Sequence, residues 1–241
     1  MLVIGRATRL SRYVTGLDKS YTATARFGAV SDTLDAEGEI LPLDTHMPGE
    51  ETLREAMERF TGEISQIPPM ASAVKVGGER LYKAHRRGET IERAERPVTI
   101  HSFSLTHVDA ASQTATFYIS CSSGTYVRSL IADLADALGT GAYLTALRRT
   151  SVGHLSLEHA SVLDQLNESN ICNHIIQSSR MVKHLPVVHV RGRMEKFVRS
   201  GRSLGAAGID GPYRVMGGDD LLAVYRDVGR EARPEVVLCA D

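Results

Sequence analysis

The feature that most constrains the fold is a strand, a turn and a helix that follow one another without a break. Apolar and polar residues alternate over Ala115–Cys121, which is the period-two pattern of a half-buried strand. Ser122–Gly124 then predicts a turn, because serine caps helices and glycine tolerates unusual backbone angles. The next apolar residues recur at helical spacing as far as Gly139, and they are Leu130, Ile131, Leu134 and Leu138. We therefore expect a sheet with an amphipathic helix packed against it.

Arg128 lies in the first turn of that predicted helix. Backbone N–H groups already make the N-terminus of a helix positive, so cations are favoured at the opposite end. An arginine at this place therefore needs an anion, either a carboxylate or a phosphate. The alternative is a solvated surface arginine, and the local sequence leaves both interpretations open.

Other segments show the same two spacings of apolar residues, which are every second residue in a strand and every third or fourth in a helix. Alternation predicts strands over Tyr21–Phe27 and Val98–Val108, and three- and four-residue spacing predicts a helix over Glu51–Phe60. A further, basic helix is predicted over Arg80–Arg87. Short β-like runs separated by glycine and proline fill Lys183–Asp241. Together these patterns predict an α+β fold, with a mixed, largely antiparallel sheet flanked by helices and a small β-rich C-terminal domain.

The composition is that of an ordinary globular protein, with 42% hydrophobic and 24% charged residues among 241. The three cysteines form no CxxC pair, which favours reduced thiols: they are Cys121, Cys172 and Cys239. No apolar run is long enough to span a membrane, and the first residues do not form a signal peptide. We expect a soluble, cytoplasmic protein that does not bind a membrane.

The net charge of −1 conceals segments of opposite charge. Asp32–Glu58 contains nine acids and one base, whereas Lys75–Thr99 contains seven bases and four acids. Lys183–Arg202 contains six bases and one acid. Separated basic segments can bind nucleic acid if they share a face of the molecule, although charge runs also occur as solvated faces.

Several familiar chemistries are not indicated. The chain has neither a GxSxG nucleophile elbow nor a GxxxxGK[ST] phosphate loop. The acidic turn at Ser31–Glu39 lacks the order of ligands found in calcium loops, and His154, Glu158 and His159 do not match zinc-helix spacing. We expect no metal site.

A series of short segments resembles the successive motifs of bacterial tRNA pseudouridine-55 synthases, the TruB family. In order along the chain, the segments are GRATRL (5–10), DKSY (18–21), GAVSDTLDAEG (28–38), QIPPMASAVK (66–75), RLY (80–82), GTYVRSL (124–130) and LRR (147–149). The likeness covers about residues 1–155. The C-terminal segment resembles, less tightly, a PUA-like RNA-binding domain. The resemblance implies a catalytic domain over 1–182 and a PUA-like domain over 183–241.

The resemblance also implies an activity. Members of this family isomerise uridine 55 in the TΨC arm of tRNA, breaking the N1–C1′ bond and rejoining the uracil through C5. A base stacked inside a folded loop must first be flipped into a pocket. No cofactor or metal is implied, the expected partner is tRNA, and we expect a monomer.

Particular residues acquire roles from the same resemblance. Arg128 would pair with the catalytic aspartate and orient it. Tyr21 would stack on the flipped base, and Tyr126 and Leu147 would line its pocket. The residues expected to contact RNA phosphates are Lys19, Lys75, Arg80, Arg86, Arg87 and Arg148.

One departure from the family pattern concerns the nucleophile. In the family, the nucleophilic aspartate belongs to a segment of the type GTLDPxATG, immediately before the segment that begins here at Met1. The 241 residues contain no such segment, and Asp18, Asp32 and Asp35 fall in later motifs. We therefore expect Arg128 to lack an aspartate partner in this chain, and the chain to be inactive alone.

Two explanations of this departure stay open. The sequence is either a shortened reading of an ordinary synthase or a genuine short chain. In the second case it would be a catalytically silent tRNA-binding or RNA-folding protein.

Overall fold

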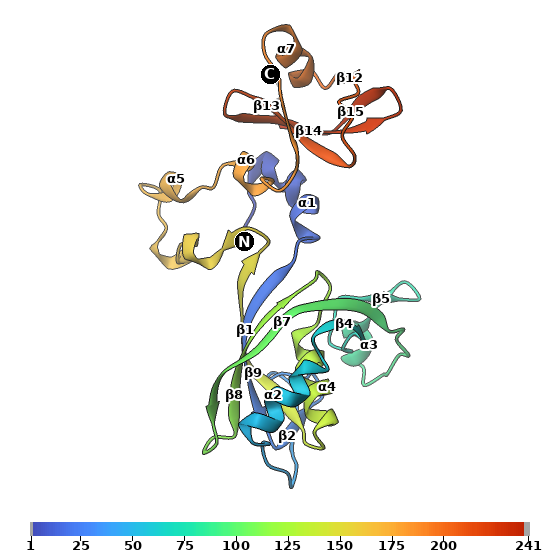
Figure 1. Ribbon diagram of the computed structural model, residues 1–241, viewed down its shortest axis with the longest axis vertical. Helices are drawn as coiled ribbons and strands as arrows, with labels where there is room; N and C mark the ends of the chain where they lie inside the picture. Colours follow the sequence, from blue (N-terminus) through green and yellow to red (C-terminus); the bar gives the residue numbers. More distant parts are fainter. Residues whose placement is uncertain (1, 239–241) are drawn as a thin grey trace. The chain divides into compact units, whose positions relative to one another are not determined.

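The structure is a computed structural model that describes residues 2–238. They form two compact units: Leu17–Gly153, and a second unit that combines the first residues, through Gly16, with those from His154 onward (Figure 1). No helix in the described part of the chain is long and apolar enough to cross a membrane. The division into domains at residues 182 and 183 stays a prediction.

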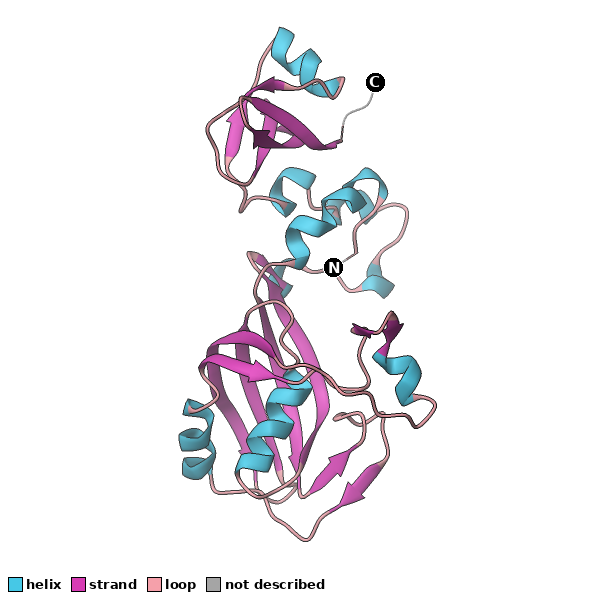
Figure 2. Ribbon diagram, turned by 90° about the vertical axis from the view of Figure 1, so that its right-hand side faces the viewer, coloured by secondary structure: helices cyan, strands magenta, loops and turns pink. Residues whose placement is uncertain are grey.

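The unit Leu17–Gly153 is built on an antiparallel sheet (Figure 2). The order of its strands is β9-β1-β8-β7-β4. Its strands are β1 (Lys19–Phe27), β4 (Gly62–Gln66), β7 (Arg96–Asp109), β8 (Thr114–Cys121) and β9 (Ala142–Val152). The antiparallel sheet predicted from the sequence is confirmed. The consecutive strands β7 and β8 pair with each other as an antiparallel hairpin.

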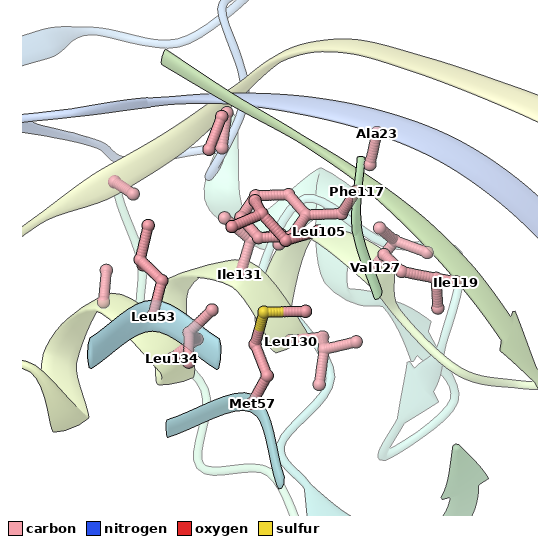
Figure 3. Packing of buried hydrophobic residues seen from close by; sticks show 14 of the residues in the cluster. Ala23, Leu53, Met57, Leu105, Phe117, Ile119, Val127, Leu130, Ile131 and Leu134 are labelled. Carbon is pink, nitrogen blue, oxygen red and sulfur yellow. The ribbon is translucent and has the colours of Figure 1, made fainter. Parts of the chain in front are cut away.

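Two helices pack on one face of this sheet, α2 (Glu50–Glu58) and α4 (Val127–Ala137). The sheet contributes alternate residues such as Ala23 of β1 and Phe117 of β8, both fully buried. Figure 3 shows Phe117 surrounded by apolar side chains from both helices. The period-two and helical patterns of the sequence therefore identified the core correctly.

Smaller elements surround the sheet. The strands β2 (Ala29–Ser31) and β3 (Ile40–Pro42) form an antiparallel pair. A separate lobe consists of β5 (Lys75–Val76), β6 (Glu79–Arg80) and α3 (Leu81–His85). It has its own small core of Met70, Leu81 and Ala84.

The helix predicted over Arg80–Arg87 is shorter in the structure. Arg80 belongs to a strand because it pairs with Lys75, and α3 ends at His85. Gly88, with a φ of +73°, follows within three residues and turns the chain.

The second unit contains a smaller sheet with the order β11-β13-β14-β15-β12. Its strands are β11 (Val187–His189), β12 (Leu204–Gly205), β13 (Pro212–Gly217), β14 (Asp220–Val228) and β15 (Glu231–Val237). The remaining elements of the unit are η1 (Gly5–Leu10), α1 (Ser11–Thr15), β10 (Leu155–Ser156), η2 (Leu157–His159), η3 (Leu163–Gln165), α5 (Ile171–His174), α6 (Ser178–Met181) and α7 (Arg193–Arg199). The β-rich C-terminal domain predicted from the sequence is confirmed.

The N-terminal segment packs against this C-terminal sheet, which the sequence did not indicate. The Tyr13 hydroxyl donates a hydrogen bond to Glu235 Oε2 at 2.6 Å. Arg9 Nη1 donates to the carbonyl oxygen of Val237 at 2.8 Å. The two ends of the chain are therefore joined by polar contacts along β15.

Candidate functional site

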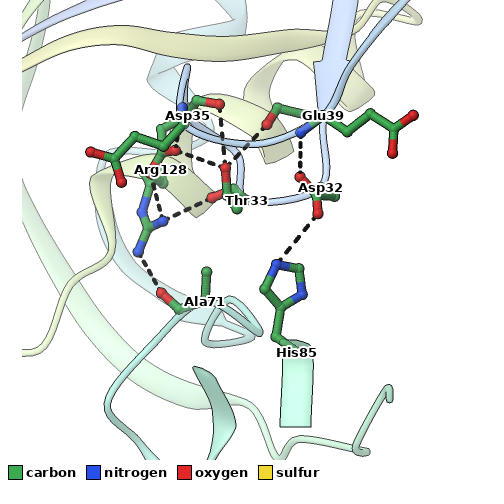
Figure 4. A network of polar contacts seen from close by, with 9 residues as sticks. Asp32, Thr33, Asp35, Glu39, Ala71, His85 and Arg128 are labelled. Atoms are coloured by element: carbon green, nitrogen blue, oxygen red, sulfur yellow. Dashed lines mark hydrogen bonds and ion pairs between the residues drawn. The ribbon is translucent and has the colours of Figure 1, made fainter. Parts of the chain in front are cut away.

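The guanidinium of Arg128 is held by three acceptors at the start of α4 (Figure 4). Nη1 donates to the carbonyl oxygen of Thr33 at 2.8 Å and to Asp35 Oδ2 at 2.7 Å. Nη2 donates to the carbonyl oxygen of Ala71 at 2.8 Å. The Arg128 side chain is only 21% exposed. Of the two interpretations left open by the sequence, the structure therefore selects the arginine that meets an anion.

The expectation that Arg128 lacks an aspartate partner is wrong, because Asp35 of the same chain supplies one. Asp35 lies in the loop between β2 and β3, and it forms an isolated parallel bridge with Leu144 of β9. The amide of Leu144 also donates to the carbonyl oxygen of Leu34 at 3.1 Å. These long-range backbone contacts bring the loop to the start of α4, and a linear sequence does not reveal them.

The loop that carries Asp35 is braced internally. Asp35 Oδ1 accepts hydrogen bonds from Thr33 Oγ1 at 2.7 Å and from the amide of Glu37 at 3.1 Å. Asp32 Oδ1 accepts from the amide of Glu39 at 2.8 Å, and Asp32 Oδ2 lies 3.4 Å from His85 Nε2. Both oxygens of Asp35 are therefore occupied.

Tyr21 and Leu147 lie on the helix-covered side of the sheet. Tyr21 packs against the main core, and its strand partners on β8 and β9 are Ile119 and Arg149. Leu147 pairs with the buried Ala23, two residues further along β1, and its side chain is 47% exposed. Both are placed where they can line a pocket at this face.

Arg149 is a site residue that the sequence analysis missed. It is the strand partner of Tyr21, and its guanidinium lies close enough to act on the Tyr21 phenol. Burial raises the pKa of Tyr21, and this contact with Arg149 opposes the rise. The sequence did contain Arg149, as the second arginine of the LRR segment. Only the register of β9 on β1 shows that Arg149, and not Arg148, is opposite Tyr21.

Arg148 takes the opposite side of β9. It pairs with Thr22, whose neighbour on β8 is Tyr118. Successive side chains of a strand point to opposite faces. The structure therefore does not bring Arg148 together with Tyr21 and Leu147.

Tyr126 immediately precedes α4 and is half-buried, two residues before Arg128. Lys19 begins β1, where burial lowers the pKa of its amine and the nearby charge of Arg149 lowers it further. The structure thus gathers Lys19, Tyr21 and Arg149 at one end of β1.

The other predicted RNA contacts cluster in the β5-β6-α3 lobe. Lys75 and Arg80 are strand partners, and the guanidinium of Arg86 lies over the Tyr82 ring at 5.5 Å from its centre. Arg87 differs, because it forms ion pairs with both Glu79 and Glu89 at 2.7 Å. Two carboxylates therefore neutralise the charge of Arg87.

Lys75 also lines a pocket of about 390 Å³ together with Arg93 and Arg96. Arg93 Nη1 donates to the carbonyl oxygen of Pro68 at 3.2 Å. The two arginines belong to the predicted basic segment but were not singled out. Their shared pocket becomes visible only when the lobe folds.

Among residues 2–238, no group of three or more His, Cys, Asp or Glu side chains is placed to hold a metal ion. Cys121 and Cys172 are free thiols, and Cys239 lies outside the described residues.

The chain is similar to known proteins over most of its length. Residues 1–127 match the family model described as TruB family pseudouridylate synthase (N terminal domain). Residues 128–185 match the model described as tRNA pseudouridylate synthase B C-terminal domain.

Several relatives carry the name tRNA pseudouridine synthase B, among them the following two. The protein from Nocardia farcinica is 40% identical over 250 residues, which cover 99% of this chain and 79% of the relative. The protein from Cupriavidus metallidurans is 40% identical over 235 residues, covering 95% of this chain and 74% of the relative. One chain in the solved structure titled Crystal Structure of a Cbf5-Nop10-Gar1 Complex superposes with a TM-score of 0.72 at 22% identity, over 99% of this chain and 71% of the other. At that identity the likeness concerns the fold.

Proposed function

The chain belongs to the TruB family of pseudouridylate synthases, and from this premise we propose that it acts on uridine 55 in the TΨC arm of tRNA. The observation that carries the proposal is the guanidinium of Arg128, which is fixed by three acceptors at the start of α4. The motif residues Tyr21 and Leu147 lie on the side of the sheet that α4 covers.

The reaction requires the target base to leave its stack. Tyr21 offers a half-buried aromatic face on which a flipped uracil can stack. Tyr126 and Leu147 line the pocket around it. In this pocket the N1–C1′ bond is broken, the uracil turns, and a bond between C1′ and C5 replaces the first. C5 loses its hydrogen as a proton and N1 gains one, so that the product is an isomer of the substrate.

Asp35 acts on Arg128 and not on the substrate. Its two oxygens accept hydrogen bonds from Arg128, Thr33 and the Glu37 amide, and in the sequence Asp35 falls in a motif after the one that carries the nucleophile. The nucleophile is the aspartate of a GTLDPxATG-type segment, and no such segment occurs in the 241 residues. We infer that the 241 residues bind the RNA and that isomerisation also needs an aspartate nucleophile of that type.

The bound RNA is held by its phosphates. Lys19, Lys75, Arg80 and Arg86 supply cations on the unit Leu17–Gly153, and phosphate contacts set orientation without reading sequence. The protein acts as a monomer in the cytoplasm, where its tRNA partner is found, and it uses no cofactor.

The proposal is tested with two chains, the 241-residue chain and the same chain preceded by a GTLDPxATG-type segment. Each is incubated with tRNA, and pseudouridine is mapped by primer extension after carbodiimide treatment. We expect a stop that reports position 55 with the longer chain only. If the longer chain binds tRNA and leaves uridine 55 unchanged, the proposal is refuted and a catalytically silent tRNA-binding protein becomes the better reading.

A further inference from the structure

Gln66, the last residue of β4, makes an unusual contact with Tyr126. The Gln66 side chain is 2% exposed. Its Oε1 accepts a hydrogen bond from the Tyr126 amide at 3.0 Å, and its Nε2 donates to the Tyr126 carbonyl oxygen at 3.3 Å. One side-chain amide thus satisfies both backbone groups of a single residue. Only a side chain with both a donor and an acceptor in this geometry can do so.

This contact falls where α4 lacks an ordinary cap. Tyr126 is the N-cap residue, and it makes no side-chain cap hydrogen bond. Serine, threonine, aspartate or asparagine would normally provide one. The Tyr126 carbonyl oxygen also accepts the first helical hydrogen bond, from the Leu130 amide at 3.0 Å. The start of α4 is therefore fixed from outside the helix, by β4.

The residues after Gln66 extend the same attachment, and we call residues 66–71 the strap. Ser129 Oγ donates to the carbonyl oxygen of Ile67 at 3.2 Å. Arg128 Nη2 donates to the carbonyl oxygen of Ala71 at 2.8 Å. Two prolines between these points, at 68 and 69, each restrict their own backbone angle. The strap is thus a stiff segment that makes hydrogen bonds to three residues at the start of α4, which are Tyr126, Arg128 and Ser129.

We propose that Gln66 is a positioning residue, whose side-chain amide sets the start of α4 and thereby aims Tyr126 and Arg128 at the target uridine. The consequence for the uridine rests on the proposed function. The effect on α4 does not, and it can be measured without RNA.

Three variants of the 241-residue chain separate positioning from general stability. Gln66→Met fills similar volume but removes both hydrogen bonds. Gln66→Glu keeps the shape and can donate to the Tyr126 carbonyl only when its carboxyl is protonated. Gln113→Met is the matched control, because Gln113 Oε1 accepts from another backbone amide, that of Met47, at 3.2 Å.

The first measurement is amide hydrogen exchange over residues 126–130. Loss of one hydrogen bond should make exchange of the Tyr126 amide roughly 2- to 10-fold faster in Gln66→Met. Gln113→Met should match the parent chain in this segment. Unchanged exchange in Gln66→Met would overturn the proposal.

The second measurement uses a TΨC stem-loop with 2-aminopurine beside the target uridine, whose fluorescence rises when the uridine is flipped. Gln66→Met should bind the RNA and give no rise. Gln66→Glu should give none at a pH of about 8 and recover as the pH falls to about 5, because burial raises the pKa of a carboxyl and the protonated form restores the donor. A Gln66→Glu profile that does not change with pH, or a full rise in Gln66→Met, would overturn the aiming role. If the parent chain itself gives no rise, the aiming of the uridine is refuted, whereas the exchange result still decides whether Gln66 sets the start of α4. The proposed function is decided separately, by the mapping of pseudouridine with the longer chain.

Discussion

At the scale of single residues, Arg128 and Asp35 form a partly buried ion pair at 2.7 Å, with side chains 21% and 24% exposed. Removing either partner leaves the other without its charge complement in a poorly solvated place. A double-mutant cycle of Arg128→Ala and Asp35→Ala, measured by urea unfolding, should give a coupling energy of about 1–3 kcal/mol. The control is the pair Arg54–Glu50 on α2, at 2.6 Å but 52% and 55% exposed, for which about 0.3–0.5 kcal/mol is expected. Equal coupling energies in the two cycles would contradict the claim that partial burial strengthens the Arg128–Asp35 pair.

Asp133 on α4 should make stability depend on pH. Burial, followed by the charge of Asp136, raises the pKa of Asp133 from 3.8 to about 6. The folded state therefore binds a proton on Asp133 more tightly than the unfolded state does. The contribution of Asp133 to stability is present at low pH and is lost as the pH rises from 3.8 to about 6. By its accessible surface Asp133 is nevertheless an exposed residue, so water screens the effect and we expect less than about 1 kcal/mol. In Asp133→Asn, the free energy of unfolding measured with urea should fall less over this pH range. An unaltered pH profile in the variant would contradict this role of Asp133.

At the scale of elements, the residues of the β2–β3 loop pack closely against one another, and this packing positions Asp35. A Cβ on Gly38 would collide with the side chains of Asp32 and Thr33, which brace the loop. Gly38→Ala should therefore displace the loop, weaken the Arg128 pair and cost about 1–3 kcal/mol, seen as a lower Tm. Gly49→Ala is the control, because no atom lies within 4 Å of the added Cβ. Indistinguishable melting temperatures for the two variants would refute the role of Gly38.

At the scale of the whole molecule, RNA affinity should depend on which cations remain free for phosphates. Each released counterion contributes about one unit to the slope of log K against log salt. Arg86→Ala should therefore lower the slope for tRNA binding by about 1. Arg87→Ala should change it little, because Glu79 and Glu89 already neutralise Arg87. Titrations at several salt concentrations measure both slopes, and a larger loss for Arg87→Ala would reverse this assignment.

Periodicity predicted the main elements of the fold because burial acts on alternate strand residues and on one helical stripe. The strand around Phe117 and the helix around Leu130 both follow from that rule, and these two side chains are fully buried. The helix expected over Arg80–Arg87 failed at its first residue, since Arg80 pairs with Lys75. Pairing between segments competes with local propensity, and the local pattern does not show which prevails.

The sequence by itself determined the family motifs, the position of Arg128 at the start of a helix and the two interpretations of that arginine, an anion partner or solvent. The tertiary structure alone decided that this anion is Asp35, that Arg149 and not Arg148 accompanies Tyr21, and that Gln66 fixes Tyr126. The physical reason is the same in each case. Neighbouring residues along the chain determine whether a residue lies in a helix or a strand. Its contact partners depend on strand register and loop closure between segments far apart in sequence.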